Sequence, residues 1–229
     1  MKAMVLFSGG VDSTTCLALA VDQYGKENVI AMSIFYGQKH DKEMKAAEEI
    51  AEYYGVEHLK LDLSKMFEFS DCSLLSHSDE EIPHESYAEQ LEGEEKPVST
   101  YVPFRNGLFL SSAASIALSK DCGVIYYGAH ADDSAGSAYP DCSEPFYKSM
   151  ADAIYIGSGN QLKLEAPFVN ENKAGIVKKG IELGVPYELT WSCYEGKEEP
   201  CGECGTCIDR VKAFEENGIE DPLIKKIYF

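Results

Sequence analysis

The chain has 229 residues, enough for one α/β domain with a small appendage but short for two full domains. Its 45% hydrophobic and 26% charged residues exclude a disordered or collagen-like chain, and the net charge of −19 disfavours a nucleic-acid partner because it repels phosphate backbones. No apolar run approaches the roughly 18 residues of a membrane helix, and no signal-peptide core is recognisable, so we expect a cytoplasmic protein without a membrane partner.

Strand-like and helix-like segments alternate along the chain, as judged from apolar periodicity. Strands are expected at 3–7, 29–35, 58–61 and 124–127, followed by an extended segment at 165–168. Helices are expected at 13–24, 42–54, 106–119, 144–156 and 172–183. The alternation predicts an α/β fold with an open, mostly parallel sheet and helices on both faces. It does not give the order of the strands.

The segment 68–97 departs in composition from the rest of the chain. It contains ten acidic residues and a single basic one, Lys96. A segment of this kind is typical of a solvated surface, so we expect an acidic insertion or loop without a site.

Four of the eight cysteines, namely Cys193, Cys201, Cys204 and Cys207, lie close together near the C-terminal end. Their spacing, C-x7-C-x2-C-x2-C, supplies the four thiolates of a closed tetrahedral zinc site. We expect one structural zinc ion per chain, with an iron–sulfur cluster or a redox disulfide as the alternatives. This divides the chain into an α/β domain, 1–190, and a zinc-binding element, 191–229.

The sequence Ser-Gly-Gly-Val-Asp-Ser at 8–13 follows the first strand and opens a helix. Glycines let backbone N–H groups approach an anion, and a helix N-terminus favours negative charge. The loop has neither the Gly-Lys-Ser/Thr ending of a Walker A motif nor the G-x-G-x-x-G of a dinucleotide fold. It resembles the pyrophosphate loop of the PP-loop ATP pyrophosphatases, which adenylate a substrate oxygen and release pyrophosphate.

Further motifs extend this resemblance over nearly the whole chain, from Phe7 to Arg210. They are Tyr-Gly-Gln-Lys-His at 36–40, Tyr-Val-Pro-Phe-Arg-Asn at 101–106, Tyr-Pro-Asp-Cys at 139–142, Thr-Trp-Ser-Cys-Tyr at 190–194 and the cysteine motif at 200–207. Together they resemble the 7-cyano-7-deazaguanine synthase (QueC) family.

The resemblance implies an adenine-nucleotide α-hydrolase-like fold, a homodimer and an ATP-dependent ligase of queuosine biosynthesis. The family converts 7-carboxy-7-deazaguanine and ammonia to the nitrile 7-cyano-7-deazaguanine. A carboxylate is a poor electrophile, and transfer of AMP to its oxygen supplies a leaving group for ammonia to displace. A second activation, of the amide oxygen, permits dehydration to the nitrile. The loop type favours AMP over ADP as by-product, although the residues leave both open.

The resemblance also implies roles for individual residues. Asp12, Arg105 and Lys173 are the expected catalytic residues, with Asp12 acting through Mg²⁺. The residues expected to bind ATP are Phe7, Ser8, Gly9, Gly10, Val11, Asp12, Ser13, Thr14, Thr15, Cys16 and Leu17. Those expected at the substrate are Tyr36, Gln38, His40, Asn106, Asp132, Asp133, Tyr139 and Asp141.

Each role competes with a purely structural one. The structural alternatives are a surface ion pair for Arg105, a helix cap for Asn106 and a solvated position for Lys173. Tyrosines are often simply packed, and a lone histidine such as His40 is more often structural than catalytic.

Two departures from the family pattern fall where substrate is expected. Phe104 replaces the usual glycine before Arg105, and the stretch 128–142 is longer than usual and ends before Ser143 instead of arginine. Three alternatives follow: a related enzyme that couples the activated acid to another amine, for instance on a protein; a PP-loop tRNA-modifying enzyme; and a non-enzymatic zinc-bearing interaction module.

Overall fold

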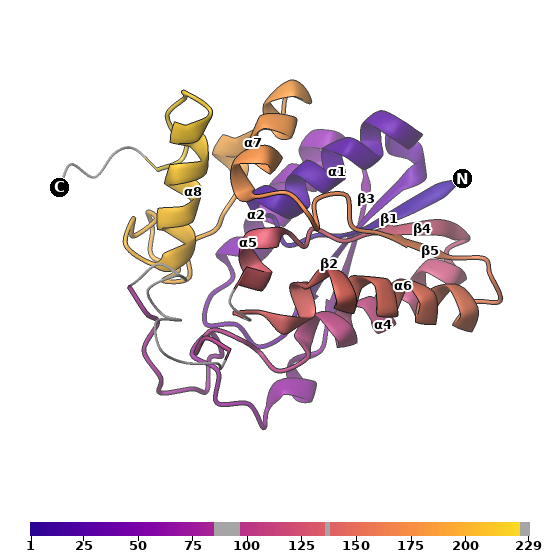
Figure 1. The fold of residues 1–229 in the computed structure, drawn as a ribbon, viewed down its shortest axis with the longest axis horizontal. Coiled ribbons are helices and arrows are strands. Elements are labelled where there is room, and N and C mark those ends of the chain that lie inside the picture. The colour runs from indigo at the N-terminus through magenta and orange to yellow at the C-terminus, as the bar shows by residue number, and fades with distance from the viewer. Residues whose placement is uncertain (85–96, 136–137, 225–229) are drawn as a thin grey trace.

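The computed structural model describes residues 1–84, 97–135 and 138–224. Its strands form one sheet in which all neighbours are parallel, in the order β3-β2-β1-β4-β5 (Figure 1). The strands are β1 (Lys2–Leu6), β2 (Val29–Phe35), β3 (Glu57–Asp62), β4 (Cys122–Tyr126) and β5 (Lys163–Glu165). The predicted open parallel sheet is confirmed, and the structure adds the order of its strands.

The helices follow the strands along the chain. They are α1 (Val11–Tyr24), α2 (Lys42–Tyr54), α4 (Arg105–Ser119), α5 (Ala131–Ser134), α6 (Glu144–Gly157), α7 (Lys173–Glu182) and α8 (Gly205–Glu216). Within the described ranges, none has both the length and the apolar character needed to cross a bilayer.

Different helices cover the two faces of the sheet. Along β1, Met4 and Leu6 point into the core beneath α4 and α6, whereas Ala3 and Val5 pack with α1 and α2 (Figure 1). This alternation is the two-residue period of a strand. The chain adds β2 and β3 on one side of β1, and β4 and β5 on the other. The carboxyl ends of β1 and β4 therefore form the switch point at which open α/β sheets bind ligands.

The last strand lies earlier than expected. The extended segment was predicted at 165–168, but the strand is Lys163–Glu165. A turn follows it, in which the N–H of Val169 donates to the carbonyl of Ala166 at 3.2 Å. Pro167 has no N–H to give to a ladder, and this explains why pairing stops before it.

The acidic segment is less solvated than predicted. Residues 72–75 are buried, and they pack with Tyr36 and Phe67 in a small hydrophobic cluster. Leu75 also forms an isolated bridge to Gln38. The acidic side chains flank this short apolar run, so composition averaged over the segment concealed it. Residues 85–96, which carry half of the acidic residues predicted to be solvated, lie outside the described residues.

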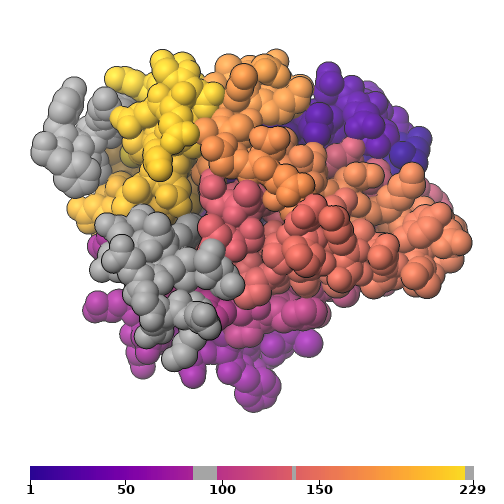
Figure 2. Space-filling model, in the orientation of Figure 1, coloured from indigo at the N-terminus to yellow at the C-terminus, as the bar shows by residue number. Residues whose placement is uncertain are grey.

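Helix α8 lies within the cysteine-rich segment and was not predicted. Its glycines and cysteines resemble turn signals, but Cys207, Arg210 and Phe214 recur at helical spacing and are buried. The helix packs beside α7, as the adjoining yellow and orange surfaces of Figure 2 show.

The fully buried guanidinium of Arg210 joins α8 to the rest of the molecule. Its Nε and Nη2 donate to the two carboxylate oxygens of Asp221 at 2.6 and 2.9 Å. Its other contacts reach Thr190 at 2.7 Å and the carbonyl of Tyr187 at 3.0 Å. A buried charge needs this full set of partners, because desolvation costs several kcal/mol per ion.

We predict that Asp221→Asn lowers the free energy of unfolding by about 3–5 kcal/mol, because it leaves Arg210 charged and buried without its counter-ion. Urea unfolding measures the change as a shift of the midpoint at constant slope. The control is Glu216→Gln, which removes an exposed pair with Lys212 at 4.0 Å and should cost less than about 1 kcal/mol. Equal losses in the two variants would contradict the prediction.

Candidate active site

A cleft of about 1180 Å³, counting its open mouth, lies at the carboxyl ends of β1, β2 and β4. The loop 8–13 forms one wall, and α4 and the start of α7 contribute side chains to the others. Eleven of the residues predicted for the site line it: Phe7, Ser8, Gly10, Asp12, Ser13, Tyr36, Gln38, Arg105, Asn106, Asp133 and Lys173.

The loop is held from two sides by backbone contacts. Gly9 has φ +81°, and a Cβ on it would lie 2.7 Å from the nitrogen of Ala47 and 2.8 Å from the carbonyl oxygen of Glu43. On the opposite side, the N–H of Trp191 donates to the carbonyl of Gly9 at 2.9 Å. Only glycine permits both this conformation and this approach to α2.

The loop presents hydrogen-bond donors to the cleft. Gly10 is the N-cap of α1 and has no side-chain cap, so the first N–H groups of the helix are available to an anion. The hydroxyls of Ser8 and Ser13 lie 3.1 Å apart beside them. A phosphate chain suits this donor set.

Six residues predicted to bind nucleotide do not line the cleft. Gly9, Val11, Thr14, Thr15, Cys16 and Leu17 are buried within the loop and the inner face of α1. Thr14 donates to the carbonyl of Gly10 at 2.7 Å, and Thr15 shares a hydrogen bond of 2.8 Å with the hydroxyl of Tyr187. The structure assigns these two threonines contacts that support the loop.

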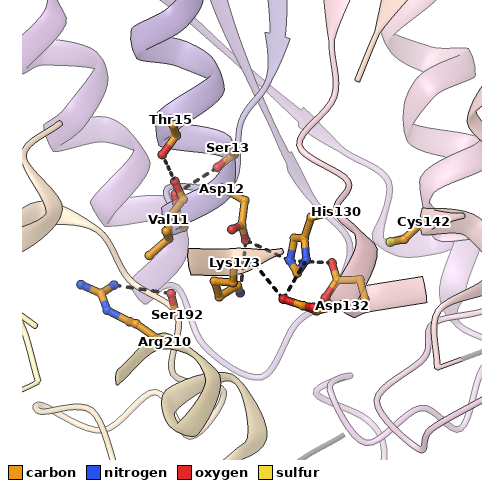
Figure 3. Close-up of polar contacts among 12 residues, drawn as sticks. Val11, Asp12, Ser13, Thr15, His130, Asp132, Cys142, Lys173, Ser192 and Arg210 are labelled. Atoms are coloured by element: carbon orange, nitrogen blue, oxygen red, sulfur yellow. Dashed lines mark hydrogen bonds and ion pairs between the residues drawn. The ribbon is translucent and has the colours of Figure 1, made fainter. Parts of the chain in front are cut away.

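A cluster of charged side chains lies beneath the loop (Figure 3). The Nζ of Lys173 lies 3.3 Å from Oδ2 of Asp12. Burial alone raises the pKa of Asp12, but the charges of Lys173 and His130 outweigh it and hold the pKa below its ordinary value. Burial alone lowers the pKa of Lys173, and Asp12 and Asp133 more than reverse this. Both partners are therefore charged at neutral pH.

His130, which sequence reasoning did not select, occupies the centre of this cluster (Figure 3). It is 1% exposed, and its Nε2 lies 3.3 Å from Asp133 and 3.7 Å from Asp12. Among the described residues, neither ring nitrogen has a hydrogen-bond partner. In the sequence, only its position shortly after β4 and before two aspartates indicated that it could belong to the site.

Another part of the lining holds a cation that is stacked on aromatic rings. The guanidinium of Arg105 lies 5.0 Å from the ring centre of Tyr36 and 6.0 Å from that of Phe109. Burial alone lowers the pKa of Arg105, but Tyr36 and Tyr194 raise it above its ordinary value. The arrangement offers a planar cation for a carboxylate or phosphate.

Glu43, also missed by the sequence analysis, lines the cleft from the first turn of α2. Burial raises the pKa of Glu43 to about 7. The positive charge of Arg105 opposes this rise, and Cys193 adds to it. Its position three residues after His40 was the only signal in the sequence.

Four residues predicted at the substrate have other contacts. Asp141 accepts a hydrogen bond from the N–H of Asn106 at 2.9 Å at the start of α4, and Asp132 accepts one from the N–H of Lys173 at 2.7 Å at the start of α7. The buried hydroxyl of Tyr139 bonds Thr100. None of the three lines the cleft.

The fourth, His40, lines a smaller cavity nearby, and its Nδ1 accepts from the N–H of Lys42 at 3.3 Å. Gln38 and Asn106 line the main cleft, but both also have structural contacts. Gln38 accepts from the N–H of Tyr36 at 2.9 Å, and the side chain of Asn106 donates to Cys142 at 3.3 Å.

The four clustered cysteines form a compact set of donors. Their sulfur atoms lie within 4.8 Å of one another. Backbone N–H groups approach the sulfurs, including those of Cys201 on Cys193 and Cys204 on Cys201, both at 3.3 Å. Four convergent sulfurs with amide donors suit a tetrahedral metal ion.

Comparisons with known proteins identify the family of the chain. The family model of the queuosine biosynthesis protein QueC matches residues 2–218. A 7-cyano-7-deazaguanine synthase from Archaeoglobus fulgidus is 44% identical over 98% of this chain and 90% of its own length. Proteins of the same name from Thermoplasma volcanium and Methanoregula boonei are 45% and 43% identical, each over 97% of this chain and over 90% and 98% of their own lengths.

We predict that Gly9→Ala lowers the free energy of unfolding by about 2 kcal/mol or more, through backbone strain and a clash with α2. Gly10→Ala is the matched control, since Gly10 has φ −81° and its nearest contact for a Cβ is Ser8 Oγ at 3.4 Å. Denaturant unfolding of both variants provides the measurement. Comparable stabilities would show that the loop does not depend on this approach.

Proposed function

The chain belongs to the QueC family of queuosine biosynthesis proteins, and from this premise we propose that it makes 7-cyano-7-deazaguanine from 7-carboxy-7-deazaguanine, ammonia and ATP. The observation that carries the proposal is that one cleft is lined both by a loop suited to phosphates and by Arg105, which stacks on Tyr36. Such a cleft can hold a nucleotide and an aromatic acid against each other.

In the first step, an oxygen of the substrate carboxylate attacks the α-phosphorus of ATP, and pyrophosphate leaves. The N–H groups at the start of α1 hold the phosphates, and the charged Nζ of Lys173 stabilises the negative charge that develops on them. Arg105 orients the carboxylate.

In the second step, the nitrogen of ammonia attacks the activated carbonyl carbon, and AMP leaves with the carboxylate oxygen. The product is an amide. A second ATP then activates the amide oxygen in the same way, and loss of AMP and of the two N–H protons leaves the nitrile. One cleft serves both activations, because each transfers AMP to an oxygen on the same carbon.

The residues present fit two metal ions. Asp12 is the best ligand for Mg²⁺, since its Oδ1 is buried without a hydrogen-bond partner among the described residues. Mg²⁺ bound there neutralises phosphate charge. The four cysteines suit Zn²⁺, whose structural sites take four thiolates and leave no open position. We propose that zinc fixes the turn that leads from Trp191 into α8.

The two residues that replace the usual glycine and arginine do not favour a different acceptor. Phe104 and Ser143 are both absent from the lining of the cleft, although four residues of the longer stretch 128–142 belong to it. Ser143 instead caps α6, where its hydroxyl accepts from the N–H of Phe146 at 3.3 Å. The net charge of −19 likewise favours small-molecule substrates over tRNA. A homodimer, as the family resemblance implies, and the cytoplasmic location expected from the sequence complete the proposal.

We predict that the protein, given ATP, ammonium and 7-carboxy-7-deazaguanine, releases the nitrile, as mass analysis of the base product would identify. Asp12→Ala should lower turnover by about 100-fold or more, because it removes the proposed Mg²⁺ ligand. Asp22→Ala, on the exposed side of the same helix, is the control and should keep full activity. A primary amide as the end product would show that dehydration to the nitrile does not occur, and a protein adduct would favour coupling to another amine.

We predict one zinc ion per chain in protein purified under reducing conditions, measured by elemental analysis. Cys207→Ser should lose the metal and lower the thermal midpoint, because a structural ion contributes folding free energy. Cys122→Ser, which changes a buried cysteine outside the cluster, should retain it. Iron in place of zinc would overturn the assignment.

A further inference from the structure

A second, much smaller cavity of about 200 Å³, counting its open mouth, adjoins the cleft. Four of its seven lining residues, namely Tyr36, Gln38, Glu43 and Tyr194, also line the cleft. The space within it takes about one molecule of the size of water or ammonium, so a nucleotide does not fit. Leu74 and the 38–40 segment form another part of its wall.

Glu43 is half-buried and lines both cavities. Its main chain lies close to Gly9 of the loop, since a Cβ on Gly9 would lie 2.8 Å from the carbonyl oxygen of Glu43. The ionisable groups around it are Arg105 of α4, Cys193 of the metal cluster, and Tyr36, Lys39, His40 and Tyr194 of the cavity walls. The Nζ of Lys39 is engaged elsewhere, with the carbonyl of Glu80 at 2.8 Å.

The chemistry of the second step requires a base at this point. At neutral pH ammonia is present almost entirely as ammonium, which has no lone pair with which to attack carbon. A carboxylate attracts the cation, and a base whose pKa lies near the working pH can accept its proton and hold it. Glu43 satisfies the second condition, since burial raises its pKa to about 7. His40, the candidate from the sequence, lines the small cavity but not the cleft that holds the activated acid, and its Nδ1 already accepts from the N–H of Lys42.

We propose that the small cavity is the ammonium subsite and that Glu43 is the catalytic base that removes a proton from ammonium before it attacks. This deepens the proposed function and rests on it. One proton passes from nitrogen to the carboxylate of Glu43. The lone pair then forms the C–N bond, the C–O bond to AMP breaks, and the second surplus proton leaves with AMP or water.

Arg105 acts on this base through its charge. Its positive charge opposes proton uptake by Glu43 and so keeps a larger fraction of the carboxyl ionised. Only the ionised carboxylate attracts ammonium and can accept its proton.

The test compares two nucleophiles in Glu43→Gln at pH 7. Hydroxylamine is neutral there, needs no deprotonation before attack, and yields a hydroxamate from the activated acid. We expect kcat/KM for ammonium to fall by about 100-fold or more, whereas ATP-dependent hydroxamate formation stays within about threefold of the wild type. Glu49→Gln, on the exposed face of the same helix, should change neither reaction.

Every other outcome counts against the inference. An ammonium reaction within about threefold of the wild type would remove Glu43 from catalysis. A parallel loss of both reactions would place it in activation or folding. Failure of the wild-type protein to form hydroxamate at all would instead refute the proposed function.

Discussion

The close approach of Gly9 to the first turn of α2 is the contact on which the site depends. It brings the main chain of the loop against Glu43 and Ala47, which only a residue without Cβ permits. On the other side, Trp191 bonds the same glycine, and its indole N–H donates to the carbonyl of Cys193 at 2.8 Å. The predicted phosphate loop, the proposed base and the four clustered cysteines are thus linked by backbone contacts and by the indole of Trp191.

Charges of opposite sign gather at two places in the site. Asp12, Asp133 and Asp132 lie around Lys173 and His130, whereas Arg105 lies over the ring of Tyr36. The first group has three carboxylates and at most two cations, so bare phosphate would add to an excess of negative charge that a divalent cation would reduce. The proposed places of the substrate carboxylate at Arg105 and of a magnesium–phosphate complex at Asp12 follow this distribution of charge.

Much of the fold could be predicted from the sequence, and part of the site. The helices and strands from β1 to β4 could be predicted because their apolar residues recur at the spacing of a helix or a strand. The phosphate loop could be predicted because its residues are contiguous in the sequence. Glu43 and His130 could not be identified, because their entry into the cleft depends on how α2 and β4 pack. Asp141 was expected at substrate, yet it accepts from Asn106 at a helix start, and a capping carboxylate looks the same in sequence.

The region before Arg105 shows how a departure from a family pattern can leave a site intact. Phe104 has φ +54° and ψ 25°, a left-handed conformation that costs a side-chain-bearing residue about 1–2 kcal/mol and explains why glycine is usual there. Its ring packs over Gly107 and edge-on to Phe146, with the ring centres 5.9 Å apart, and its N–H donates to Tyr101 at 2.9 Å. These contacts offset the strain and keep the start of α4 in place. Arg105 therefore enters the cleft from the same backbone conformation that glycine would supply.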